Sequence, residues 1–135
     1  MKKYLLGFVV TLILLTGESF ASSLTKKDSA IMRGEKNLLI AVNSNNYGLK
    51  SSAVQILGEI KSNKAVIPLM KILKSSDDES LRIVAANSLY KIESPMGMFA
   101  VRQAIRFDES YRVRKVCRNL YLDSGKQEIA AAKQK

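Results

Sequence analysis

The sequence predicts an all-α protein, a short α-solenoid of about three antiparallel helix pairs. Three segments place apolar and small residues at steps of three and four, the spacing of one face of an α-helix. They begin at Leu49, Leu81 and Val113, so the pattern returns every 32 residues. A constant step of this length is typical of stacked helical units. The chain shows neither sustained apolar–polar alternation nor an Asn-Gly or Asp-Gly turn, the signals of strands and hairpins.

Each of the three segments follows another apolar segment, and the two together make a helix pair. The preceding segments lie at residues 38–42, 66–73 and 98–105. One pair cannot bury its apolar stripe alone, and about three stacked pairs are needed for stability. The repeat domain is therefore predicted at residues 30–124, with units at about 30–62, 63–94 and 95–124.

Turn and capping residues mark the ends of the predicted helices. Asn63 is expected to cap the helix that follows it, and Ser94 to cap the helix that begins with Pro95. Gly125 is expected to end the last helix, because glycine readily takes the left-handed conformation that closes helices. Residues 125–135 are then a C-terminal tail, frayed or folded as a short end cap.

The stretch at residues 81–89, Leu-Arg-Ile-Val-Ala-Ala-Asn-Ser-Leu, resembles the second helix of a HEAT-like repeat. In that family the helix carries an apolar residue, Arg, two further residues, two alanines, one further residue, a small residue and Leu. Residues 49–58 look like the same motif one unit earlier, and residues 65–69 are similar to the family's first helix. The resemblance implies antiparallel helix pairs in a slightly curved stack, and binding more often than catalysis.

The resemblance extends over residues 30–124 and is poorest in the third unit, where Cys117 and Arg118 replace the two small residues. Arg118 stands where the earlier units have Val54 and Ala86. A charge at this position fits a helix against which no further pair packs, so the third unit is the predicted terminus. A different α-solenoid or a compact helical bundle is the alternative reading of the same pattern.

Residues 1–21 have the parts of a secretory signal peptide. Two lysines precede an uncharged run at residues 4–15, and small residues stand before a cleavage site after Ala21. A helix of this length rises about 18 Å, too little for a hydrocarbon core of about 30 Å, so a permanent membrane anchor is the weaker alternative. We expect an exported protein, periplasmic or secreted, in which polar residues 22–29 precede the repeats.

The composition excludes several kinds of catalytic site. The chain of 135 residues has no histidine and one cysteine. A tri-histidine zinc site, a Ser-His-Asp triad and a Cys-His pair are therefore excluded within one chain. We predict no catalytic residue, no metal and no cofactor, and a protein that is not an enzyme. An accessory lyase is the alternative that would contradict this.

Two further features are interpreted as structural. Cys117 stands where earlier units have Ala53 and Ala85, so it is expected to be a small buried side chain rather than a redox or dimer-linking thiol. The acidic residues 77–79 lie in a turn before a helix, where carboxylates stabilise the positive end of the helix dipole. A catalytic pair or a cation site is the alternative for these acids.

Lys50, Arg82 and Arg114 recur at the 32-residue step, one in each unit. In HEAT-like proteins the residue that matches Arg82 often pairs with an acid in the turn, so we interpret the three as a structural ladder. Asp108, six residues before Arg114, is such an acid, and Asp77 and Asp78 precede Arg82. Unit one has only Ser44 at that position, which makes Lys50 the least well paired. A basic ladder for an acidic ligand is the alternative.

A second basic group gathers in the third unit and is the candidate binding site. Its members are Arg102, Arg106, Arg112, Arg114, Lys115 and Arg118. Arg114 and Arg118 are four residues apart and share a helix face. Basic residues near tyrosines can bind phosphates or polyanions, although an exposed terminal helix has the same composition.

The chain is strongly basic, with 22 Lys and Arg against 12 Asp and Glu and a net charge of +10. The repeat pattern favours a non-catalytic protein-interaction module, a small scaffold or adaptor, because stacked repeats present one extended face. The charge favours the alternative, a peripheral binder of anionic lipid or wall polymer. Nucleic acid is not an expected partner of an exported protein.

Overall fold

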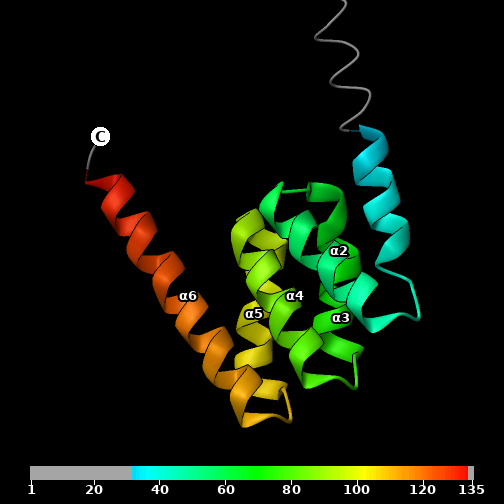
Figure 1. The fold of residues 1–135 in the computed structure, drawn as a ribbon. Coiled ribbons are helices and arrows are strands. Elements are labelled where there is room, and N and C mark those ends of the chain that lie inside the picture. The colour runs from blue at the N-terminus through cyan, green and yellow to red at the C-terminus, as the bar shows by residue number, and fades with distance from the viewer. Residues whose placement is uncertain (1–31, 134–135) are drawn as a thin grey trace, which may run out of the picture. The chain divides into compact units, whose positions relative to one another are not determined.

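The computed structural model describes residues 32–133, and every regular element in this part of the chain is a helix (Figure 1). The elements are a helix through residue 41, α2 (Tyr47–Glu59), the 3₁₀ turn η1 (Asn63–Ala65), α3 (Val66–Ser75), α4 (Glu79–Ile92), α5 (Pro95–Phe107) and α6 (Tyr111–Ala132). The signal peptide predicted at 1–21 and the polar segment at 22–29 lie outside the described residues.

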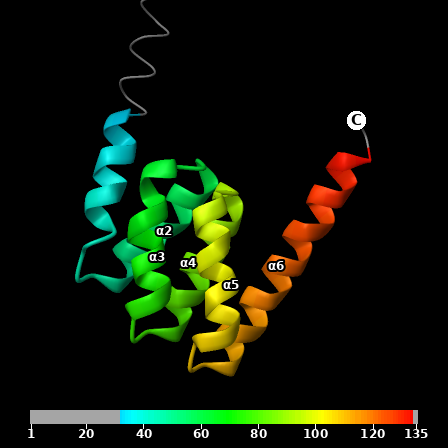
Figure 2. The same cartoon turned by 180° about the vertical axis from the view of Figure 1, so that it is seen from behind.

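Within residues 37–133 the helices form two layers. α2, α4 and α6 lie side by side in one layer, and α3 and α5 lie side by side in the other (Figures 1 and 2). α3 and α4 form one antiparallel pair and α5 and α6 the next, each joined by a short turn. The predicted all-α solenoid of antiparallel pairs is therefore confirmed.

The core lies between the two layers. Leu57 and Leu89 hold the same position in successive units, and both are fully buried. Burying a leucine side chain contributes about 2 kcal/mol through the hydrophobic effect. Ala53, Ala85 and Cys117 likewise correspond to one another and are buried, which confirms that Cys117 fills a small interior site.

The helix caps repeat at the same 32-residue step as the apolar stripe. The side chains of Asn46 and Asp78 accept hydrogen bonds from backbone N–H groups at 3.0 and 2.7 Å, at the starts of α2 and α4. Ser110 does the same for α6. Ser94 caps α5 with Pro95 at its first position, as predicted. Each cap satisfies a backbone donor that the first turn leaves unpaired.

The prediction that Asn63 caps the next helix is wrong. Residues 63–65 form the 3₁₀ turn η1, and α3 begins after it at Val66 with no side-chain cap. The backbone N–H of Ala65 donates a hydrogen bond to the carbonyl of Ser62 at 3.1 Å, so Asn63 is part of the tight turn and does not cap α3. Tight turns of this kind are common at helix starts and satisfy backbone groups without a capping side chain.

The prediction that Gly125 ends the last helix is also wrong, because α6 continues to Ala132. Gly125 does not adopt the left-handed conformation that a terminating glycine needs. Side chains on either side of it hold α6 to α4. Tyr90 donates a hydrogen bond to the Asp123 carboxylate, and Gln127 donates one to the Tyr90 hydroxyl at 2.7 Å. The acceptor Asp123 raises the pKa of Tyr90, because ionising the phenol would lose this bond.

Gly125→Ala should raise the free energy of unfolding by about 0.5–1 kcal/mol, because alanine loses less backbone entropy in a helix than glycine. A methyl group built at this position meets no atom within 4 Å, so no steric cost opposes the gain. Urea unfolding followed by circular dichroism measures the change. An unchanged or lower stability would mean that the last turns of α6 are not helical in solution.

α4 approaches its two neighbours differently. A Cβ atom added to Gly58 on α2 would lie 2.7 Å from Cα of Ser88, so these helices pack almost backbone to backbone. Tyr90 holds the position of Gly58 one unit later and carries a large ring toward α6. α6 accordingly diverges from α4 toward its C-terminal end, as Figure 1 shows.

Candidate functional site

Arg82 joins the second unit to the third. Its side chain is 5% exposed and that of Asp108 is 6% exposed. The guanidinium donates from Nε to Oδ2 of Asp108 at 3.0 Å and from Nη2 to Oδ1 at 3.1 Å. Nη1 donates to the carbonyl of Ser76 at 2.7 Å, in the turn of its own unit. A planar fork on a carboxylate is a strong, directional pair, and here it connects α4 to the turn before α6.

Arg114 repeats only part of this arrangement. Its Nη1 donates to the carbonyls of Asp108 and Glu109 at 2.7 and 2.8 Å, just as Arg82 contacts its own turn. Within residues 32–133 no carboxylate forms an ion pair with Arg114, and the side chain of Lys50, unlike its backbone N–H, makes neither a hydrogen bond nor an ion pair. The carboxylate that pairs with Arg82 thus comes from the turn of the next unit. The equivalent residue for Lys50 is Ser76, which has no carboxylate.

The acids at 77–79 also link units. Asp78 caps α4, and the carboxylate of Glu79 accepts a hydrogen bond from Oγ of Ser110 at 2.7 Å. Arg112 lies 3.5 Å from the same carboxylate. The sequence interpretation missed this second link, although Ser110 is one of the repeated caps and Glu79 follows another. In the described part of the chain, no three His, Cys, Asp or Glu side chains are placed to hold a metal ion.

The six residues of the basic group do not share one environment. Arg102 and Arg106 are exposed on α5, whereas the other four lie on α6. Arg112 contacts Glu79, and Arg114 is half-buried with its guanidinium 5.9 Å from the centre of the Tyr111 ring. Lys115 and Arg118 are exposed, with no ion pair recorded among the described residues. The single basic site expected from the sequence is thus divided between structural contacts and free surface.

The exposed face of α6 mixes basic and apolar side chains. Steps of three or four residues place them on one side of the helix. They are Lys115, Arg118, Leu122, Lys126 and Ile129, all exposed. No helix among residues 32–133 is both long and apolar enough to cross a membrane.

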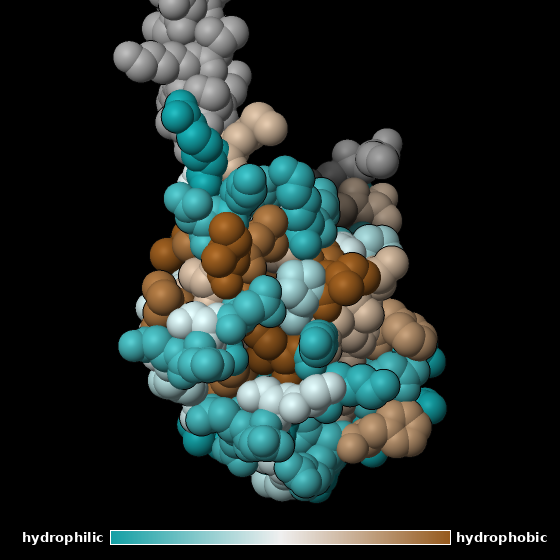
Figure 3. All heavy atoms as spheres, turned by 90° about the vertical axis from the view of Figure 1, so that its right-hand side faces the viewer, coloured by the Kyte–Doolittle hydropathy of each residue, from teal (hydrophilic) through white to brown (hydrophobic). Residues whose placement is uncertain are grey.

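The other end of the stack is apolar. Leu49, Ile56 and Ile60 on α2 are exposed, whereas their counterparts one unit later are buried: Leu81, Ser88 and Ile92. Figure 3 faces this end, where hydrophobic residues gather at the centre of the surface with hydrophilic ones around them. The exposed face of α2 therefore corresponds to the face of α4 that is buried against α2.

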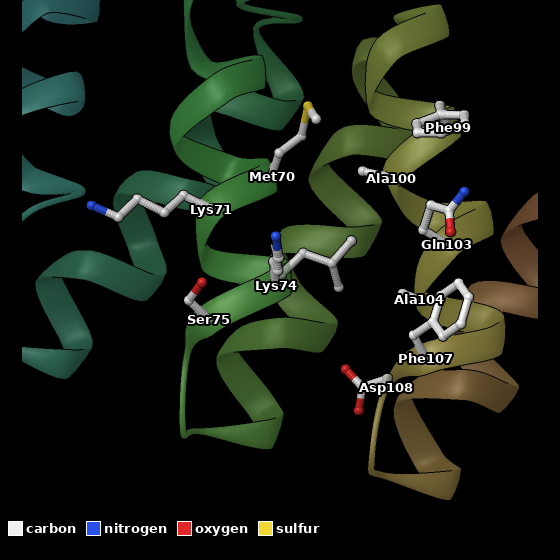
Figure 4. A pocket seen from close by; sticks show the side chains of 11 residues that line it. Met70, Lys71, Lys74, Ser75, Phe99, Ala100, Gln103, Ala104, Phe107 and Asp108 are labelled. Carbon is white, nitrogen blue, oxygen red and sulfur yellow. The ribbon is translucent and has the colours of Figure 1, made fainter.

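A groove of about 750 Å³ runs between α3 and α5 in the second layer (Figure 4). Eleven residues line it: Met70, Lys71, Leu73, Lys74, Ser75, Phe99, Ala100, Gln103, Ala104, Phe107 and Asp108. Phe99 is 56% exposed and Phe107 is 77% exposed. Most of the lining is apolar, and large exposed aromatic side chains on ordered helices are typical of binding surfaces. No pattern in the sequence brought these residues together.

Cys117 should be unreactive in the folded protein. Burial first, and the charge of Asp108 second, raise the pKa of its thiol to about 12. A thiol-reactive disulfide reagent at mildly alkaline pH should label the protein only after urea unfolds it. Because the folded-state pKa lies above the ordinary value of 9.0, this group also makes stability fall as pH rises from about 9 toward 12. Fast labelling without urea would contradict the burial.

The sequence also matches a known family. The family model described as HEAT repeats matches residues 35–120, most of the predicted repeat domain. No curated protein matches the chain at a significant level. The match, the 32-residue helix pairs and the buried arginine between units agree with one another, and the chain belongs to the HEAT repeat family.

Proposed function

We propose that this protein is a non-catalytic interaction module, a small scaffold or adaptor, that acts outside the cytoplasm after residues 1–21 are removed. HEAT repeats are typically protein-interaction scaffolds. The observation that carries the proposal is the α3–α5 groove, where Phe99 and Phe107 are exposed on well-packed helices. Aromatic side chains that protrude from an ordered surface contribute strongly to binding when a partner covers them.

The export part is tested on the full chain with a C-terminal tag, produced in a secretion-competent bacterial host. We expect the tagged protein outside the cytoplasm, with a mass that lacks residues 1–21. A chain that keeps these residues and stays in the cytoplasm would contradict export, and it would leave the interaction proposal to be judged separately.

The interaction part is tested by capture from an envelope extract, followed by washes at low and then high salt. A protein held in fixed proportion through the high-salt wash supports a packed protein interface, because apolar contacts are not screened by salt. Phe99→Ser with Phe107→Ser should abolish this capture. Leu122→Ser is the matched control, since Leu122 is also 56% exposed but lies on α6. Equal capture by all variants would place the interaction on another surface of the module, and no protein held through the high-salt wash by the parent chain would contradict the interaction proposal.

A second candidate is a peripheral binder of anionic lipid or wall polymer. It is favoured by the exposed face of α6, which combines Lys115, Arg118 and Lys126 with Leu122 and Ile129. Basic and apolar residues on one helix face suit a negatively charged interface. Cosedimentation with anionic vesicles should then be strong only at low salt and lost in Lys115→Glu with Arg118→Glu. Such a result, with no protein captured at high salt, would favour this function over the scaffold.

A further inference from the structure

We propose that the α3–α5 groove docks a helical segment of a partner protein that places large apolar side chains in the groove and carboxylates beside Lys74. This inference rests on the proposed function as an interaction module and names the chemistry of its partner. The binding surface then lies in the second layer, away from the basic group on α6.

The shape of the groove follows from the spacing of its residues. On α5, Phe99, Gln103 and Phe107 are four residues apart and form one ridge. Ala100 follows Phe99 and Ala104 follows Gln103, and the small side chains of these alanines form the floor of the groove. Figure 4 shows the phenylalanines standing along α5 beside these alanines. Two large residues next to two small ones produce a trough that follows the helix axis.

α3 forms the opposite wall. Met70 and Lys74 are four residues apart on it, and buried Leu73 lies between them at the floor. In Figure 4, Lys74 lies on the side of α3 that faces α5, whereas Lys71 extends to the other side of α3. The groove is thus an apolar trough with an ammonium group on one rim.

The charge around the groove has one sign. Asp108 is the only acid in the lining, and its carboxylate is occupied by Nε and Nη2 of Arg82 and by the backbone N–H of Ser110 at 2.8 Å. Lys71 and Lys74 are exposed, and no ion pair with either is recorded within residues 32–133. No acid in the lining therefore neutralises Lys74, and a partner with carboxylates complements this rim.

The open form of the groove favours a peptide over a small ligand. Small-molecule sites enclose most of the ligand surface. This trough is bounded on two sides by ridges of parallel helices, which suits an amphipathic helix whose apolar residues recur every three or four positions. A small anionic amphiphile, such as a fatty acid, shares the chemistry and becomes an alternative outcome of the test.

The test selects binders to the full-length protein from a display library of random helical peptides. Selected peptides should combine aromatic or large aliphatic residues with Asp or Glu on the adjoining face. Labelled copies of one such peptide are then titrated into the protein, and binding is followed by fluorescence anisotropy. Lys74→Glu and Phe107→Ser should each weaken binding by about tenfold or more, since both side chains are exposed and in contact with the bound helix.

Matched controls carry the same changes on α6. Lys126→Glu and Leu122→Ser should leave the affinity unchanged, and all four variants should keep the helical circular dichroism of the parent. Peptides without acidic residues, or groove variants that bind as well as the controls, would overturn the proposal. So would dodecanoate that binds the groove when no peptide is selected, because the occupant would then be a small amphiphile.

The outcomes separate this inference from the proposed function. If groove variants still capture the envelope partner at high salt while no peptide binds the groove, the module binds through another surface and only the inference fails. If neither wild-type capture nor peptide binding is found, both fail.

Discussion

Replacing Asp108 by alanine should lower the free energy of unfolding by about 3–5 kcal/mol. The change leaves the guanidinium of Arg82 buried, with its contacts to the turn carbonyls and the exposed carboxylate of Glu109 at 3.6 Å, but without its buried bidentate partner. The cost arises chiefly from this poorly compensated buried charge, because the ion pair itself nearly offsets its own desolvation. Guanidinium chloride unfolding followed by circular dichroism gives the free energy.

Two further variants make the prediction specific. Asp108→Asn keeps the shape and one acceptor oxygen, so it should fold and show a smaller loss than Asp108→Ala. Glu93→Ala breaks the exposed pair with Lys61, whose side chains are 63% and 56% exposed, and should cost less than about 1 kcal/mol. A loss for Asp108→Ala no greater than that for Glu93→Ala would show that the buried pair does not hold the second and third units together.

Gly58→Ala should lower the free energy of unfolding by about 1–3 kcal/mol, although alanine is the better helix former. The new Cβ would lie 2.7 Å from both Cα and Cβ of Ser88, and the backbone of α4 cannot move aside without disturbing the core behind it. Thermal or urea unfolding measures the loss. Gly125→Ala is the matched control, since the same change in open space should stabilise.

The close approach of the two helices can be tested by a compensating change. Ser88→Gly in the Gly58→Ala background removes the Cβ and Oγ that the new methyl meets, while the backbone of residue 88 stays in its way. The Gly58→Ala change should therefore lower the free energy of unfolding less in the Ser88→Gly protein than in the parent protein. A Gly58→Ala protein that is as stable as the parent would mean that α2 and α4 are further apart in solution than in the structure.

The difference between Gly58 and Tyr90 explains why the repeat is regular in sequence and irregular in space. Both residues hold the same position in their helices. Glycine lets α2 pack directly on α4, whereas the tyrosine ring keeps α6 at a distance and bonds to Asp123 and Gln127. These hydrogen bonds fix α6 to α4 on both sides of Gly125, so the helix continues where the sequence alone predicts that it ends.

The N-terminal and C-terminal ends of the stack differ in a way that bears on function. Arg118 is exposed on α6 where Ala86 is buried on α4, and it lies in a face that mixes basic and apolar side chains. At the other end, Leu49, Ile56 and Ile60 stay exposed on α2. The apolar periodicity alone predicts that these three residues are in the core. Periodicity indicates which face of a helix is apolar, but it does not indicate whether another helix covers that face.

The helical class, the 32-residue step and the family could all be predicted without coordinates, because apolar periodicity and capping residues act within one helix or turn. The same spacing marked Arg82 and Asp108 as members of a structural ladder. The packing of the helices was needed to establish that Asp108 pairs with the arginine of the preceding unit, that Gly125 lies inside α6, and that Phe99 and Phe107 border a groove. These features depend on contacts between helices that are distant in the chain. The geometry of such contacts is decided by side-chain size and reach across the interface rather than by local spacing.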